Sequence, residues 1–205
     1  MKDLTTGKPI KIILLFAIPL FIGQLFQLFY SLADTRIVGA ILGETSLAAV
    51  GATTTLSDFL IGLLNGFTNG CAIIIATYFG SGDRDNMKKA IGGTILSGIV
   101  LSVLISAGCL LFLPRILCAL NVADFLMAES KAYIGIVLAG LLAATLYNVC
   151  AAILRALGDT FTPLLFLILA AVLNVVLDYT LIKYGNMGVA GAALATVIAQ
   201  AVSAV

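Results

Sequence analysis

Long runs without a charged residue divide this chain, and they limit the folds that are open to it. Six such runs, of 18 to 25 residues each, follow one another along the 205 residues. A helix needs about 20 apolar residues to cross the hydrocarbon core of a bilayer. Lipid offers no partner for backbone N–H and C=O groups, so each run that enters it must form a helix. The runs are Ile12–Ala33, Phe59–Gly82, Ala90–Pro114, Ala132–Leu154, Thr160–Leu177 and Tyr184–Val205.

The composition also points to a membrane protein and excludes several kinds of site. Hydrophobic residues make up 61% of the chain and charged residues 10%, whereas soluble domains carry about 25% charged residues. The net charge of +1 provides no basic excess for binding nucleic acid. The chain has no histidine, so a Ser/His/Asp triad, a histidine-ligated metal and a histidine proton relay are excluded. We therefore expect neither an enzyme nor a cofactor.

The predicted fold class is an all-α membrane protein, a bundle of six transmembrane helices that forms a single domain over residues 1–205. Seven lysine and arginine residues, including Lys2 and Lys8, lie on the side of the N-terminus, and four lie on the other side. Because positive residues favour the cytoplasmic side, the N-terminus is predicted to be cytoplasmic. The predicted spans are residues 10–38, 45–80, 87–113, 129–156, 160–183 and 189–205.

Two aspartates border these apolar runs and need a compensating partner. Asp34 follows the first run and Asp178 follows the fifth, and an aspartate at the centre of a membrane helix costs roughly 2.5–3.5 kcal/mol. At a helical rise of about 1.5 Å per residue, both fall in the outer half of the bundle. Asn174, Thr196 and Tyr133 are expected at similar depths, and Asn174 shares a helix face with Asp178 because it precedes it by four residues.

This group of side chains could hold a cation or a proton. Carboxylate, amide and hydroxyl oxygens suit a hard cation such as sodium. Two neighbouring carboxylates cannot both ionise cheaply, so the pair could instead bind a proton. A third possibility is that both aspartates lie at wetted helix ends and pair with Arg36 and Lys183. The possible sodium ligands are Asp34, Asn174, Asp178 and Thr196.

A second set of polar residues predicts a cavity wall or a polar seam between helices. The polar residues of the second helix recur on one helical face, and its Asp58 is expected near the middle of the bilayer. A charge at that depth rarely faces lipid. In the first helix, Tyr30 and Gln27 lie one and two turns below Asp34 on one stripe. The candidate substrate-cavity residues are Gln27, Thr54, Asp58, Asn65 and Asn69.

Two further features concern the packing and bending of helices. Gly62, Gly66 and Gly70 form a small-residue ladder, which is typical of a close approach between membrane helices. Pro19 lies inside the first predicted helix, where it removes a backbone donor. We expect Pro19 to bend that helix and to provide a hinge.

Several motifs, in this order and at these spacings, resemble the multidrug and toxic compound extrusion (MATE) family. Pro19, the Asp34-Thr35 pair and Gly39, followed by LAAVG at 47–51, resemble that family's first helix and the start of its second. The remaining motifs are YFGSGD at 78–83, RALGDTFTP at 155–163, Asn174-x-x-x-Asp178, and G-x-x-G-A-A-x-A-T at 188–196. The resemblance runs from about residue 10 to the end of the chain.

The resemblance implies export of cationic, amphipathic compounds across the plasma (inner) membrane of a prokaryote in exchange for sodium or protons. Family members have twelve helices in two lobes, so this chain would be the N-terminal lobe, in need of a C-terminal lobe or a second copy. We expect membrane lipid and small cationic organic substrates as further partners. The resemblance assigns cation or proton binding to Asp34, Asn174, Asp178, Tyr30, Tyr133 and Thr196. We leave out Asn148, because it falls about 29 Å from the outer face of its helix.

Two alternative functions remain open. A lipid-linked polysaccharide flippase of the same superfamily would need basic residues in its cavity to hold a pyrophosphate, whereas the residues identified here are acidic. A truncated membrane module without transport activity would also fit the absence of a second lobe. An intramembrane enzyme is disfavoured, because the sequence presents no combination of nucleophile and base.

Overall fold

A computed structural model describes residues 9–204, and these residues form helices joined by short turns, with no strand among them. Most of the long apolar runs become single helices. The elements are α1 (Pro9–Leu42), α2 (Glu44–Ser81), α3 (Arg84–Ala119), a 3₁₀ turn (Asp124–Leu126), α4 (Met127–Ala139), α5 (Leu141–Ala156), α6 (Phe161–Lys183) and α7 (Val189–Ala204).

The lengths and composition of these helices fit a multi-pass membrane protein. Four helices, α1, α2, α3 and α6, are long and apolar enough to span a bilayer. The fourth predicted span is broken, because α4 and α5 meet at a bend of 44° and only together could form a fifth crossing. Helix α7 is apolar but has only 16 described residues. The predicted all-α membrane fold is confirmed, while the count of six spans is approximate.

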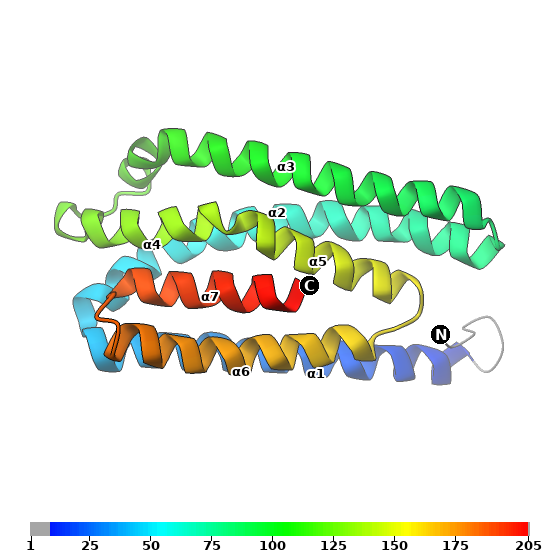
Figure 1. Ribbon diagram of the computed structural model, residues 1–205, viewed down its shortest axis with the longest axis horizontal. Helices are drawn as coiled ribbons and strands as arrows, with labels where there is room; N and C mark the ends of the chain where they lie inside the picture. The colour runs from blue at the N-terminus through cyan, green and yellow to red at the C-terminus, as the bar shows by residue number, and fades with distance from the viewer. Residues whose placement is uncertain (1–8, 205) are drawn as a thin grey trace.

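The chain runs back and forth along the long axis of the molecule, with α4 and α5 together making one pass (Figure 1). Helix α1 packs along α6, and α2 packs along α3. Helix α7 contacts α6 on one side and α4 and α5 on the other. The turns that join α1 to α2, α3 to α4 and α6 to α7 gather at one end of the bundle (Figure 1).

Two helices extend beyond the predicted spans. Helix α1 continues beyond residue 38 to Leu42, and only Gly43, with a φ of 88°, separates it from α2. Helix α3 continues through Pro114 to Ala119, because neighbouring helices and local adjustments can satisfy the backbone group that proline frees in a membrane helix. Lys2 and Lys8, which contributed to the predicted orientation, lie outside the described residues.

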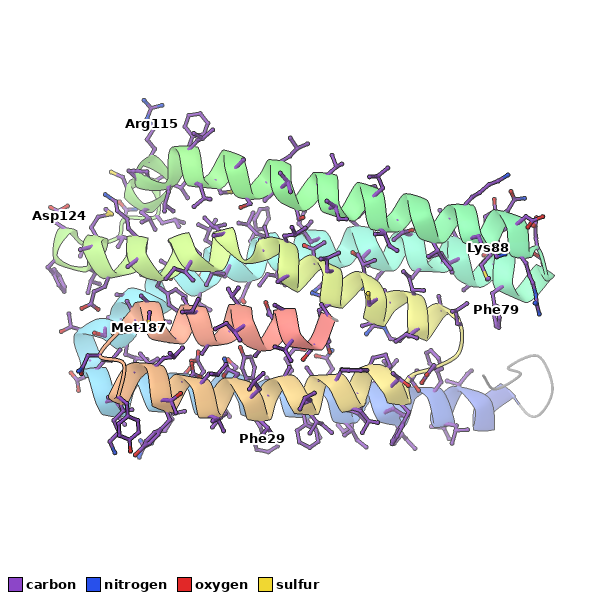
Figure 2. The ribbon with its side chains drawn as sticks, viewed as in Figure 1. Phe29, Phe79, Lys88, Arg115, Asp124 and Met187 are labelled. Atoms are coloured by element: carbon purple, nitrogen blue, oxygen red, sulfur yellow. The ribbon has the colours of Figure 1, made fainter. Side chains whose placement is uncertain are left out.

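The interior holds two apolar clusters, and many large apolar side chains remain on the surface. One cluster joins α2, α3 and α4, and the other joins α1, α2, α6 and α7. Phe29 points outward from α1, whereas Lys88 and Arg115 lie at opposite ends of the bundle (Figure 2). Apolar flanks with charges at the two ends are the arrangement that a bilayer favours.

Glycine permits one very close helix contact, at the break between α4 and α5. A Cβ atom added to Gly140 would lie 2.1 Å from Cγ2 of Val197 on α7. By contrast, a Cβ on Gly62, Gly66 or Gly70 would meet nothing within 4 Å. The glycine ladder of α2 therefore does not mediate the close approach that its spacing predicted, at least within the described residues.

The contact at Gly140 predicts a specific pattern of destabilisation. Gly140→Ala should cost about 1–3 kcal/mol through overpacking, and should lower the midpoint of thermal unfolding followed by far-UV circular dichroism in detergent. Gly135→Ala in α4 is the matched control, because its Cβ would meet only Leu113 Cδ2 at 3.9 Å. Adding Val197→Ala should recover part of the loss. Equal midpoints for the two alanine variants would contradict this packing.

A carboxylate cap at the start of α6 predicts a pH-dependent contribution to stability. Asp159 accepts hydrogen bonds from the backbone N–H groups of Thr162 (3.0 Å) and Phe161 (3.1 Å) and from the Thr162 hydroxyl (2.7 Å). These bonds, above all the one from the Thr162 backbone, hold the pKa of Asp159 below its usual range. The contribution should therefore be complete above the unfolded value of about 3.9 and disappear as the pH falls through the lower folded value.

Replacing the cap tests this interaction. Asp159→Ala should destabilise the protein at neutral pH by about 1 kcal/mol, the typical effect of losing a helix cap. Asp159→Asn keeps one acceptor oxygen and should lose less. The measurement is the thermal midpoint at pH 7 and at pH 3, where the difference between the wild type and Asp159→Ala should shrink. A difference that is independent of pH would exclude a role for the ionised carboxylate.

Candidate functional site

A cavity of about 370 Å³ lies within the bundle, and α1, α2, α4, α5, α6 and α7 contribute to its wall. Polar side chains line it from every one of these helices except α6, whose contribution is Leu167, Ala170 and Ala171. Two carboxylates, Asp34 and Asp58, are part of the lining, and no lysine or arginine of the described part of the chain is. The cavity wall is therefore polar and acidic.

A buried polar pocket lies behind this wall, where α1 meets α6. Asn174 and Asp178 of α6 are 0% exposed and do not line the cavity. Asp34 of α1 lies at the boundary, since it lines the cavity while one of its carboxyl oxygens is buried. The carboxyl groups of Asp34 and Asp178 are direct neighbours, within reach of a hydrogen bond when one of them carries a proton.

The hydroxyl of Thr196 connects the three helices around this pocket. Tyr30 of α1 donates a hydrogen bond to Thr196 Oγ1 at 3.3 Å, and Nδ2 of Asn174 donates to the same oxygen at 3.2 Å. The Thr196 hydroxyl in turn donates to the carbonyl oxygen of Ala192 at 3.2 Å. Thr196 thus fixes the side chains of α1 and α6 relative to α7.

The pocket contains more hydrogen-bond acceptors than donors. Four buried oxygens of this pocket have no hydrogen-bond partner among the described residues: Asp34 Oδ1, Asn174 Oδ1 and both carboxyl oxygens of Asp178. Buried polar atoms in native proteins are nearly always paired with protein, water or an ion. Unpaired acceptors of this kind can be satisfied by a cation or by added protons. The oxygen atoms of this pocket therefore fit either of the two coupling ions predicted from the sequence, sodium or the proton.

The chemistry of this pocket differs from that of a transition-metal centre. Within residues 9–204, no three His, Cys, Asp or Glu side chains group in a way that could hold a metal ion. The candidate ligands are two carboxylates, one amide oxygen and one hydroxyl. Such all-oxygen sets suit hard cations.

An apolar cluster encloses the pocket at the end of the bundle where α1 turns into α2. Val38, Ile182 and Ala192 belong to one buried cluster. Each lies one helical turn from a pocket residue: Val38 follows Asp34 by four positions, Ile182 follows Asp178 by four, and Ala192 precedes Thr196 by four. The side chain of Tyr133 packs against the same cluster. This packing excludes water from that end of the pocket.

The structure brings together most, but not all, of the predicted site residues. The alternative in which Asp34 and Asp178 pair with Arg36 and Lys183 at wetted helix ends does not fit. Arg36 is exposed, and Lys183 donates a hydrogen bond to the hydroxyl of Tyr179. The predicted cavity residues that line the cavity are Gln27, Thr54, Asp58 and Asn65. Asn69 does not line it, because it lies about 6 Å farther along α2 than Asn65.

Sequence reasoning missed several lining residues. Gln24 and Ser31 line the cavity, and they could have been found, because they continue the stripe of Gln27 and Asp34 at helical spacing. Asn148 also lines the cavity, although its depth excluded it from the predicted site. The cavity extends farther along the bundle than the predicted site does, since it is lined from Asp34 to Gln24 of α1, and α5 is bent by 44° relative to α4.

Comparisons with known proteins agree on one family. The MatE family model matches residues 19–180. The "Probable multidrug resistance protein YpnP" of Bacillus subtilis is 29% identical over 201 residues, covering 98% of this chain and 45% of that protein. The chain thus spans less than half the length of such relatives.

Solved structures give the same result. One, described as an outward-facing conformation of a multidrug resistance MATE family transporter of the MOP superfamily, matches 97% of this chain and 44% of its own, with a TM-score of 0.91 and 30% identity. A MOP superfamily transporter from Pyrococcus furiosus, described as having a binding pocket of reverse polarity, matches with the same coverage, score and identity. The chain belongs to the MatE family of membrane transporters.

Proposed function

We propose that this chain is the ion-coupling lobe of an antiporter that exports cationic, amphipathic compounds in exchange for sodium or protons. The observation that carries the proposal is the meeting of Asp34 and Asp178 in a buried pocket beside an acidic cavity. Four acceptor oxygens there have no partner among the described residues. A bound cation or proton supplies the missing positive charge or donor.

Coupling follows from the position of this pair between two helices. Asp34 belongs to α1 and Asp178 to α6, so an ion shared by them stabilises the arrangement in which α1 packs on α6. Loss of the ion leaves two unneutralised carboxylates as neighbours, and their repulsion favours separation of the helices. A ligand shifts a conformational equilibrium only through such a difference in affinity. We propose that α1 responds by bending at Pro19, which lies inside the helix.

The charge of the cavity supports a cationic substrate. Asp34 and Asp58 are part of its lining, and lysine and arginine are absent from that lining among the described residues. A flippase that carries a pyrophosphate needs the opposite charge, so the acidic wall disfavours that alternative. We propose that the N-terminus is cytoplasmic, which would leave the buried pocket nearer the outer face of a prokaryotic plasma membrane. The C-terminal lobe of the same transporter, or a second copy of the chain, would complete the substrate path.

Neutralising either member of the pair tests the coupling. Asp34→Asn and Asp178→Asn should each reduce ion-driven efflux of ethidium at least tenfold, in cells that express the transporter containing this lobe, while protein levels in the membrane persist. The physical reason is that the asparagine amide, unlike the aspartate carboxylate, neither takes up and releases a proton nor balances the charge of a bound cation. Asp124→Asn is the matched control for loss of one charge, because Asp124 lies at the tip of the bundle, away from the cavity (Figure 2). Normal efflux in both pair variants would refute the proposal.

Thr196 allows sodium and proton coupling to be distinguished. Thr196→Val removes the hydroxyl oxygen that contacts Tyr30 and Asn174, whereas Thr196→Ser keeps it. If sodium is the coupling ion, the valine variant should need about tenfold more sodium for half-maximal efflux, because the hydroxyl that orients the Asn174 amide is lost and the free amide oxygen of Asn174 is no longer held in place. If the proton is the coupling ion, efflux should keep its dependence on pH and show no dependence on sodium. The readout is the initial rate of efflux against sodium concentration at two pH values.

A further inference from the structure

Asp58 places a third carboxylate within the long apolar helices, in addition to the buried pair of Asp34 and Asp178. Helix α2 extends from Glu44 to Ser81, so its midpoint lies between residues 62 and 63. Asp58 is therefore only about 7 Å along the axis from the centre of this helix. An aspartate at such a depth is costly unless it faces water or a positive charge. Asp58 faces the cavity, where it is part of the lining.

The protein supplies no cation for Asp58 from the cavity wall. Lysine and arginine are absent from the lining among residues 9–204. The described basic side chains lie near helix ends, as Lys88 and Arg115 do at opposite ends of the bundle (Figure 2). The negative charge of Asp58 is therefore available to a positively charged ligand that enters the cavity.

Asp58 differs from the buried pair in the ligand that it can receive. Both carboxyl oxygens of Asp178 and one of Asp34 are buried. A proton or a small ion can reach them, whereas a bulky organic cation cannot. The side chain of Asp58 is exposed to the cavity, so it can contact a bulky organic cation. Tyr133 of α4 also lines this cavity.

We infer that Asp58 is the counter-charge for the organic cation, and that the buried pair of Asp34 and Asp178 is reserved for the coupling ion. This inference rests on the proposed function. It adds that the positive charge of the substrate is balanced by Asp58, which does not take part in binding the coupling ion. Asn65 and Thr54 lie on the same face of α2 and line the cavity beside Asp58. The aromatic ring of Tyr133 provides a surface on which a cation can pack. The ligand class is a monovalent, lipophilic organic cation.

The test compares two probes of nearly equal size and opposite charge. Binding of tetraphenylphosphonium and of tetraphenylborate is measured by equilibrium dialysis against the protein in lipid nanodiscs, with empty nanodiscs subtracted. Asp58→Asn should weaken binding of the phosphonium about tenfold and leave binding of the borate unchanged or stronger. Asp58→Glu should restore most of the phosphonium affinity. Asp124→Asn, which removes one charge outside the cavity, should bind both probes as the wild type does.

Two results would overturn the inference. One is that Asp58→Asn binds tetraphenylphosphonium with the same affinity as the control variant Asp124→Asn. The other is an equal loss of both probes in Asp58→Asn, which would indicate a change in cavity shape rather than in charge.

A separate titration distinguishes failure of this inference from failure of the proposed function. Phosphonium affinity is measured with and without sodium, and at two pH values. Sodium or pH should change the phosphonium affinity of the wild type and of Asp58→Asn by the same factor. The affinity of Asp34→Asn should not respond to either. A wild type that responds to neither ion would refute ion coupling, and the comparison of the two probes would still decide the role of Asp58.

Discussion

The contact between the carboxyl groups of Asp34 and Asp178 governs the rest of this structure. Two carboxylates in one buried pocket repel each other unless a proton or a cation neutralises them. The helices around them supply hydroxyl and amide groups, yet four acceptor oxygens remain unpaired among the described residues. The coupling ion that we propose would neutralise these carboxylates, and its binding would then depend on how closely α1 approaches α6.

The fold holds these groups in place through packing one turn away from each of them. Val38, Ile182 and Ala192 belong to one buried cluster, and each lies four positions from a pocket residue. Apolar contacts thus position the polar groups and exclude water from one end. At the other side the pocket adjoins the acidic cavity, with Asp34 between the two compartments. A sequestered site and an open site lie side by side within one bundle.

The sequence predicts the helical membrane fold well, because charge-free runs of bilayer length have few alternatives in lipid. It also brings Asp34 and Asp178 to similar depth, since depth follows from residue number. Depth did not reveal that Asn148 reaches the cavity, because the bend at Gly140 depends on the packing of α7. Nor could the glycine spacing of α2 show which surface would cover it. Features that depend on contacts between distant segments were the ones that the sequence left open.

The contact of Val197 with Gly140 has a mechanical consequence. Thr196, which binds Tyr30 and Asn174, is the chain neighbour of Val197, whose methyl groups fill the space left by the missing side chain of Gly140. Any displacement of this part of α7 is therefore transmitted to the joint between α4 and α5. Tyr133 lies in α4 and Asn148 in α5, and both line the cavity, so this one contact connects the hydrogen bonds of the buried polar pocket to two walls of the cavity.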